Sequence, residues 1–117
     1  MTGQLNHLER VAASALRQRR KRLAARLPSI QEVLPGSLIE RYKRCGNQGC
    51  KCVQGRGHGP KYYLSVSLAG SRPQMDYVPC ERLREVLLCV RNYRQARDVL
   101  KGICAINWEL LRRRERL

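Results

Sequence analysis

The sequence predicts an α+β fold with an N-terminal helix, a small three-stranded antiparallel meander that carries a zinc loop, and a long C-terminal helix. Apolar residues recur at helical spacing near both ends of the chain, whereas residues 62–68 alternate between apolar and polar. The sequences Pro35-Gly36 and Ala69-Gly70-Ser71 are typical of turns. Because 117 residues suit one domain, we expect a single structural domain with three segments, 1–28, 29–79 and 80–117.

The first segment is expected to form a basic helix over residues 4–27 that ends before Pro28. Arg20 stands where the apolar stripe of this helix requires an apolar residue, so the second half of the helix is expected to be exposed. The stripe follows steps of three, four or seven residues and consists of Leu5, Leu8, Ala12, Leu16, Leu23 and Leu27.

The second segment begins with Ser29 and Glu32, which match a capping box and predict one helical turn over residues 30–34. Strands are predicted over residues 37–44, 62–68 and 72–78. In the second strand, Tyr62 shares the apolar face of Leu64, Val66 and Leu68, and Tyr63 faces the other way. In the third strand Met75 and Tyr77 share one face, Gln74 and Asp76 share the other, and Pro73 indicates a sheet edge.

The third segment has a broad apolar stripe from Cys80 to about Arg116 and predicts a long helix. At 1.5 Å per residue such a helix spans about 55 Å, which is longer than a domain of this size covers. We therefore expect it to break near Gly102, to protrude or to find a partner. Cys89 and Cys104 lie on its apolar side, where buried thiols are the ordinary expectation.

The residues between the first two strands predict a structural zinc site with one ion per chain. Cys45, Cys50 and Cys52 provide thiolates, and His58 provides a nitrogen, which together close a tetrahedral site. Glycines between these residues permit the tight turns that wrapping one ion requires. The alternatives are another metal or an iron-sulfur cluster, and redox-active or inert thiols. A disulfide is disfavoured because the sequence starts without an apolar signal segment.

Two residues compete for the fourth position of this metal site. His58 follows the third cysteine after five residues. In an antiparallel meander, however, the third strand ends beside the zinc loop, so Cys80 would lie at the same end of the sheet. The residues alone leave both ligands open.

The charge of the chain predicts a polyanionic partner. Lys and Arg number 24 against 9 Asp and Glu, giving a formal net charge of +15. We expect nucleic acid, DNA or RNA, contacted mainly through phosphates. No apolar run is long enough to span a membrane, so we expect a cytoplasmic, nucleoid-associated protein with neither a membrane nor a small-molecule partner.

The candidate nucleic-acid contacts lie on the first helix and around the zinc loop. On the helix, the alternative is a merely solvated basic surface. Tyr63 is a candidate for stacking on a base, and the alternative is packing against the glycine-rich loop. The candidates are Arg17, Arg19, Arg20, Lys21, Arg22, Arg26, Lys43, Arg44, Lys51, Arg56, Lys61 and Tyr63.

The run from Leu34 to Pro79 resembles an uncharacterised family of small prokaryotic proteins. The signature pieces read L-P-G-S-L, E-R-Y, R-C-G, C-x-C, G-H-G-P, Y-Y-L-S and Y-V-P, and they stand here between residues 34 and 79. Within that signature the cysteines and the histidine recur together, so the resemblance implies His58 as fourth ligand. It also implies a setting in bacterial and archaeal genomes, sometimes near transposon genes, and leaves the basic helix outside the match.

These observations favour a zinc-stabilised nucleic-acid-binding protein that acts as an accessory factor of a mobile element or a larger nucleoprotein machine. The alternative is an adaptor whose C-terminal helix pairs with a second copy or docks a larger assembly. An enzyme is not expected, because no carboxylate pair, no nucleophile with a base and no phosphate loop stands in the sequence, and a closed four-ligand zinc site has no position for water.

Overall fold

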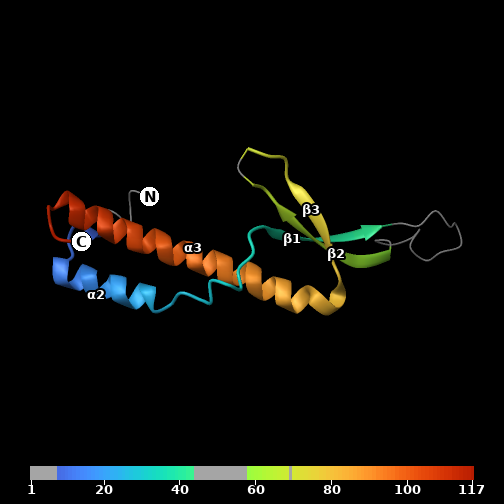
Figure 1. Cartoon of the computed structure of the whole chain (residues 1–117), viewed down its shortest axis with the longest axis horizontal. Coiled ribbons are helices and arrows are strands. Elements are labelled where there is room, and N and C mark those ends of the chain that lie inside the picture. The colour runs from blue at the N-terminus through green and yellow to red at the C-terminus, as the bar shows by residue number, and fades with distance from the viewer. Residues whose placement is uncertain (1–7, 44–57, 69) are drawn as a thin grey trace, which may run out of the picture. The chain divides into compact units, whose positions relative to one another are not determined.

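The computed structural model describes residues 8–43, 58–68 and 70–117. Its elements follow the order α2, β1, β2, β3, a short 3-10 helix and α3 (Figure 1). They form two compact units, namely residues 8–32 with 92–117, which we call the helical unit, and Val33–Arg91, which we call the sheet unit. The predicted α+β class is confirmed. Within the described ranges, no helix combines the length and apolar character needed to cross a membrane.

The helix α2 spans Ala13–Ala24 and is shorter than the helix predicted over residues 4–27. Ala12 has extended backbone, with φ −63° and ψ 147°, so the helix begins only after it. The side chain of Arg113 donates hydrogen bonds to the carbonyl oxygens of Leu8 and Glu9 at 2.7 and 3.0 Å. A helical hydrogen-bond ladder is therefore not needed to satisfy these carbonyls, and the chain bends before α2.

The core of the helical unit lies where α2 runs alongside the C-terminal part of α3 (Figure 1). Leu16 of α2 and Leu110 of α3 have no exposed surface. They pack with the buried residues Leu8 and Ile106, and partly buried Leu23 and Ala105 pack against the same cluster. Leu8, Leu16 and Leu23 of the predicted apolar stripe therefore face a core, whereas Ala12 and Leu27 are exposed and Leu5 lies outside the described residues.

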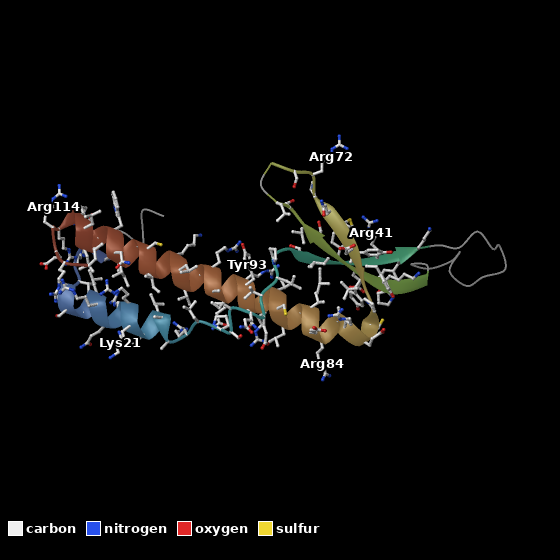
Figure 2. All side chains as sticks on the ribbon, in the orientation of Figure 1. Lys21, Arg41, Arg72, Arg84, Tyr93 and Arg114 are labelled. Carbon is white, nitrogen blue, oxygen red and sulfur yellow. The ribbon has the colours of Figure 1, made fainter. Side chains whose placement is uncertain are left out.

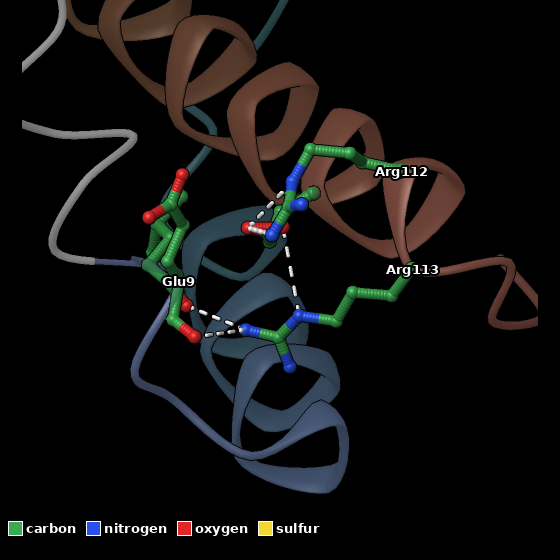
Figure 3. Close-up of polar contacts among 5 residues, drawn as sticks. Glu9, Arg112 and Arg113 are labelled. Carbon is green, nitrogen blue, oxygen red and sulfur yellow. Dashed lines mark hydrogen bonds and ion pairs between the residues drawn. The ribbon is translucent and has the colours of Figure 1, made fainter.

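A buried carboxylate secures the end of α3 in the helical unit. Glu109 is 2% exposed and accepts hydrogen bonds from Arg112 at 2.9 and 3.0 Å. Nε of Arg113 lies 3.5 Å from Oε2 of the same carboxylate (Figure 3). The hydrogen bonds from Arg112 lower the pKa of Glu109 below its ordinary value, and the charges of both arginines add to this effect against the opposing effect of burial. The same Arg113 guanidinium bonds the carbonyls of Leu8 and Glu9, so one ion-pair network joins both ends of this unit.

The helix α3 spans Leu83–Arg112 without a break, so the break expected near Gly102 is wrong. The glycine has a packing role, because a Cβ at this position would lie 2.9 Å from Cδ1 of Leu23. Close approach of α2, and not a helix end, therefore explains why glycine stands there. α3 follows the 3-10 helix Cys80–Arg82. After its last residue, Arg112, the chain turns away at Arg114, which takes φ 59°, and the amide of Glu115 bonds the carbonyl of Leu110 at 2.9 Å.

The sheet consists of β1, Ser37–Lys43, β2, His58–Val66, and β3, Gln74–Val78, in the order β1-β2-β3. Both pairs are antiparallel, so the predicted meander is confirmed. β2 begins four residues earlier than predicted. Gly36 takes φ +115°, and a Cβ there would lie 2.5 Å from the carbonyl oxygen of Ser65, which explains the predicted turn before β1.

One face of the sheet packs on the start of α3. Leu64, Val78 and Val90 are buried there, and the expected apolar face of Tyr62, Leu64 and Val66 is confirmed. Leu68 is the exception, since it lies beyond the end of β2 and is 56% exposed. Before the sheet, the helical turn expected over residues 30–34 is present only as a turn in which the Glu32 amide bonds the Ser29 carbonyl at 3.1 Å.

We predict that the packing of Leu23 on Gly102 offsets the stability that Gly102→Ala would otherwise gain from higher helix propensity. Alanine is about 0.8–1.0 kcal/mol more favourable than glycine in a helix interior. In the parent chain, Gly102→Ala is expected to leave the free energy of unfolding nearly unchanged, because Leu23 must move. In a Leu23→Ala background the same substitution is expected to stabilise by roughly the full 0.8–1.0 kcal/mol. Urea unfolding of the parent, Gly102→Ala, Leu23→Ala and the double variant measures the coupling between the two positions. Equal effects of Gly102→Ala in both backgrounds would contradict it.

Candidate functional site

Two of the predicted phosphate contacts on α2 are engaged within the helical unit. Arg17 donates to Glu115 at 3.4 Å and to the carbonyl oxygen of Arg116 at 2.8 Å. Arg20 donates to Oδ1 of Asn107 at 2.7 Å and is half-buried. The second half of α2 was expected to be exposed, and Lys21, Arg22 and Ala24 are exposed, but Arg20 is not, because a polar partner on α3 replaces the missing apolar contact. These two arginines hold α2 against the C-terminal part of the chain.

Other cations in and just after α2 are available to a ligand. Arg19 and Arg22 of α2 line a groove of about 770 Å³ beside α3, together with Arg26, which follows α2, and Lys101 of α3. None of these four cations has an ion-pair partner among the described residues, and Asp98 is the one carboxylate that lines the groove there. The floor is apolar and is formed by Leu8, Leu23, Gly102, Ala105 and Ile106. The groove therefore combines a cationic rim with an apolar floor.

The remaining predicted cations are distributed over both units. Lys21 is exposed and points away from α3 (Figure 2). Lys43 is exposed at the end of β1, and Lys61 is exposed on β2. Arg44, Lys51 and Arg56 lie outside the described residues. The structure therefore describes two separate sets of candidate contacts, one in each unit.

The second set lies on the face of the sheet that points away from its core, which we call the outer face. Paired residues of neighbouring strands share a face, so the register assigns its members. Ile39 pairs with Tyr63 and Tyr63 pairs with Tyr77, whereas Leu38, Leu64 and Asp76 pair on the core face. By the same register the outer face carries Ser37, Ile39, Arg41, Lys61, Tyr63, Ser65, Met75 and Tyr77.

Two tyrosines and one arginine form the centre of the outer face. The ring centroids of Tyr63 and Tyr77 lie 5.8 Å apart at an interplanar angle of 65°, an edge-to-face contact. The Arg41 guanidinium carbon lies 5.8 Å from the Tyr63 centroid, and its Nη2 lies 3.7 Å from the Met75 sulfur. Tyr77 is 52% exposed and Met75 is 38% exposed. Tyr63 thus contacts its neighbours on the sheet and also remains half-exposed.

Charge is segregated between the two faces of the sheet. The strands contain two carboxylates, Glu40 and Asp76, and the register assigns both to the core face with Tyr62 and Leu64. The Tyr42 hydroxyl donates to Glu40 at 2.6 Å. The strand residues on the outer face are cationic or neutral, so a polyanion meets no strand carboxylate there.

A third exposed feature lies on α3 within the helical unit. Leu100, Cys104, Trp108 and Leu111 follow steps of four, four and three residues and therefore share one helix face. Leu100, Trp108 and Leu111 are 54%, 58% and 46% exposed. Cys104 is exposed as well, which corrects the expectation of a buried thiol, whereas Cys89 is half-buried. We call these four residues the α3 stripe.

The predicted metal ligands fall mainly outside what the structure describes. Cys45, Cys50 and Cys52 lie in residues 44–57, and only the backbone of His58 is described, as the first residue of β2. Cys80 is an exposed free cysteine at the start of the 3-10 helix. Among the described residues, no three His, Cys, Asp or Glu side chains gather as a metal site. The zinc prediction is therefore untested.

Most of the chain, from α2 to the start of α3, matches a known protein family. A family described as a domain of unknown function, DUF6788, matches residues 13–87, which is more than half of the chain. The chain belongs to this family. No curated protein and no solved structure matches it. The DUF6788 match agrees with the expected resemblance to an uncharacterised family, but it begins at α2 and includes all three strands. The expectation that the basic helix lies outside the family is therefore wrong.

Three candidate residues of this DUF6788 chain were not predicted from the sequence. Arg41 and Tyr77 join Tyr63 on the outer face, and Lys101 joins the α2 arginines at the groove. The alternation of β3 did place Tyr77 with Met75, but the strand register was needed to bring it to Tyr63. Lys101 carries no local signal, because its groove partners are about eighty positions earlier in the chain.

Proposed function

We propose that this DUF6788 protein binds nucleic acid, mainly through phosphates, and acts as an accessory factor of a larger nucleoprotein machine. The observation that carries the proposal is the cationic rim of the groove in the helical unit, in a chain with a net charge of +15. Its four cations have no ion-pair partner within the described part of the chain. Phosphate contacts by such side chains release condensed counterions and provide most non-specific affinity for nucleic acid. Arg17 and Arg20 contribute indirectly, because they hold α2 in place.

Removing the rim charges is expected to weaken binding and to flatten its salt dependence. The test variant replaces Arg19, Arg22, Arg26 and Lys101 with glutamine and leaves Arg20 intact for its bond to Asn107. The slope of log affinity against log salt should fall by about 0.9 for each duplex phosphate that the variant no longer binds, or about 0.7 on a single strand. Fluorescence anisotropy with labelled DNA and RNA over a salt series measures the slope.

The matched control removes the same charge elsewhere by replacing the exposed arginines Arg72, Arg84, Arg91 and Arg94 with glutamine. A general loss of net charge would weaken both variants equally, and this outcome would contradict the role of the groove. If the parent protein binds neither DNA nor RNA at low salt, the nucleic-acid function itself is wrong.

The proposed function includes one structural zinc ion held by Cys45, Cys50, Cys52 and His58. The strand register supports this set, since Lys43 pairs with His58 and the chain enters and leaves residues 44–57 at the same end of the sheet. The last residue of β3, Val78, pairs with Tyr62 near that end, so Cys80 stays the alternative fourth ligand. The chemistry of three thiolates and one imidazole suits tetrahedral zinc, which would join β1 to β2 through the ion.

Metal analysis of untagged protein is expected to give about one equivalent of zinc per chain. His58→Ala should lose zinc to a chelator much faster than Cys80→Ser, because we assign His58 to the ion. The reverse ranking would give the fourth position to Cys80. Full folding of the protein with substoichiometric zinc, or with iron in its place, would contradict the structural zinc site.

A second candidate function is an adaptor role, and the α3 stripe favours it. An exposed tryptophan beside two exposed leucines on one helix face is typical of an interaction surface. We propose a second copy of this chain as the occupant, because one apolar stripe is self-complementary about a two-fold axis. The two copies carry like net charge, so their association should strengthen as salt screens the repulsion.

Self-association is therefore expected to rise with salt, the opposite of nucleic-acid binding. Leu100→Gln with Leu111→Gln should abolish it, whereas Leu87→Gln, at an exposed leucine of the sheet unit, should not. Sedimentation gives the mass, and the emission of Trp108, the single tryptophan, reports burial of the stripe. A monomer at all salt concentrations, with unchanged Trp108 emission, would contradict the second-copy assignment.

A further inference from the structure

We infer that the outer face of the sheet stacks unpaired bases, so that this protein prefers single-stranded over double-stranded nucleic acid. The inference rests on the proposed function and names its substrate class. The observation that carries it is the juxtaposition of Tyr63 and Tyr77 with Arg41 on a sheet face whose strands present no carboxylate.

The geometry of the tyrosine pair suits stacking. The rings come from neighbouring strands, lie 5.8 Å apart and meet edge to face at 65°. In this arrangement the edge of one ring lies against a face of the other, so each ring keeps at least one face that its partner does not cover. Tyr77, at 52% exposed, offers the more accessible ring, and Met75 beside it adds a polarisable apolar surface. Ring faces of this kind accept any base, because every base has a π face.

Arg41 does not prevent stacking on Tyr63. The guanidinium lies 5.8 Å from the ring centroid and belongs to an exposed residue. A stacked base gains more than an exposed cation–π contact, so a base can replace the guanidinium over the ring. Arg41 would then be free to pair with the adjacent phosphate, and Lys61, its register partner on β2, offers a second cation.

The paired bases of a duplex cannot use this surface. Their faces are covered by neighbouring base pairs, so only edges and phosphates are accessible from the grooves. A strand with unpaired bases can place its bases on the tyrosines and its phosphates on Arg41 and Lys61 at once. The sheet face therefore adds affinity only for single strands, whereas the groove of the helical unit contacts phosphates of either form.

The test compares the full-length, zinc-loaded parent protein with two double variants at one salt concentration. Tyr63→Leu with Tyr77→Leu removes both rings and keeps apolar side chains on the strands. Tyr63→Phe with Tyr77→Phe removes only the hydroxyl groups. The probes are labelled single-stranded DNA and RNA oligonucleotides of mixed sequence and the duplex made from the same DNA strand.

The matched control is Tyr93→Leu. Tyr93 lies 5.9 Å from the guanidinium of Arg97 and has nearly the same cation–π geometry, but it belongs to α3 in the helical unit. Its replacement should leave binding of both probes unchanged. Circular dichroism and zinc content of all variants establish that the folded state is retained.

The parent is expected to bind the single strands more tightly than the duplex. The leucine variant should lose at least about five-fold in single-strand affinity, which is the low end for losing one stacked base, and should keep its duplex affinity. The phenylalanine variant should behave like the parent. If the parent binds both probes equally and the leucine variant does not differ from it, the base-stacking inference is overturned, while a steep salt slope would still support the phosphate-binding function. If the parent binds neither probe, the proposed function fails together with the inference.

Discussion

Both hydrophobic cores of this protein are built on one helix. The first turns of α3 cover the sheet through Val86 and Val90, and its later turns cover α2 through Ile106 and Leu110. The chain has no phenylalanine and one exposed tryptophan, so neither α2 nor the three short strands have enough apolar surface for an independent core. The helix α3 is therefore the element on which the core of each unit depends. Within the helical unit, close packing explains why a glycine, costly in a helix, is tolerated at Gly102, where Leu23 needs space.

The sequence predicted the parts of the fold that local patterns determine. The alternation around Leu64 predicted which face of β2 is buried, and the turns at Gly36 and Gly70 predicted the meander. Predictions from local patterns were wrong where a residue far away in the sequence determines the local structure. The bend before α2 depends on Arg113, about one hundred positions later, and Arg20 replaces an apolar residue because Asn107 accepts its hydrogen bond. Neither partner can be read from a window of neighbouring residues.

The same distinction applies to the candidate site. Spacing predicts the thiolate ligands Cys45, Cys50 and Cys52, which lie outside the described residues, and leaves His58 and Cys80 as candidates for the fourth position. The basic run of α2 predicted a set of cations but not their roles. The tertiary structure divides that set, since Arg17 bonds the carbonyl of Arg116 and Arg20 bonds Asn107 of α3, whereas Arg19, Arg22 and Arg26 line a groove. Tyr63 was recognised by alternation, whereas its partner Tyr77 required the register of β3.

If the chain binds nucleic acid as we propose, the arrangement of its carboxylates would link that binding to folding. Three of the nine acidic residues, Glu85, Glu109 and Glu115, are engaged in ion pairs, and Glu40 and Asp76 lie on the core face of the sheet. Of the other four, Asp98 is the one that lines the groove, so the cations of the groove outnumber the carboxylates there, and the strands present none on the outer face. Self-repulsion among these cations destabilises the compact state. Under the proposed function, a polyanion that binds the folded chain would relieve this repulsion and stabilise the fold by mass action.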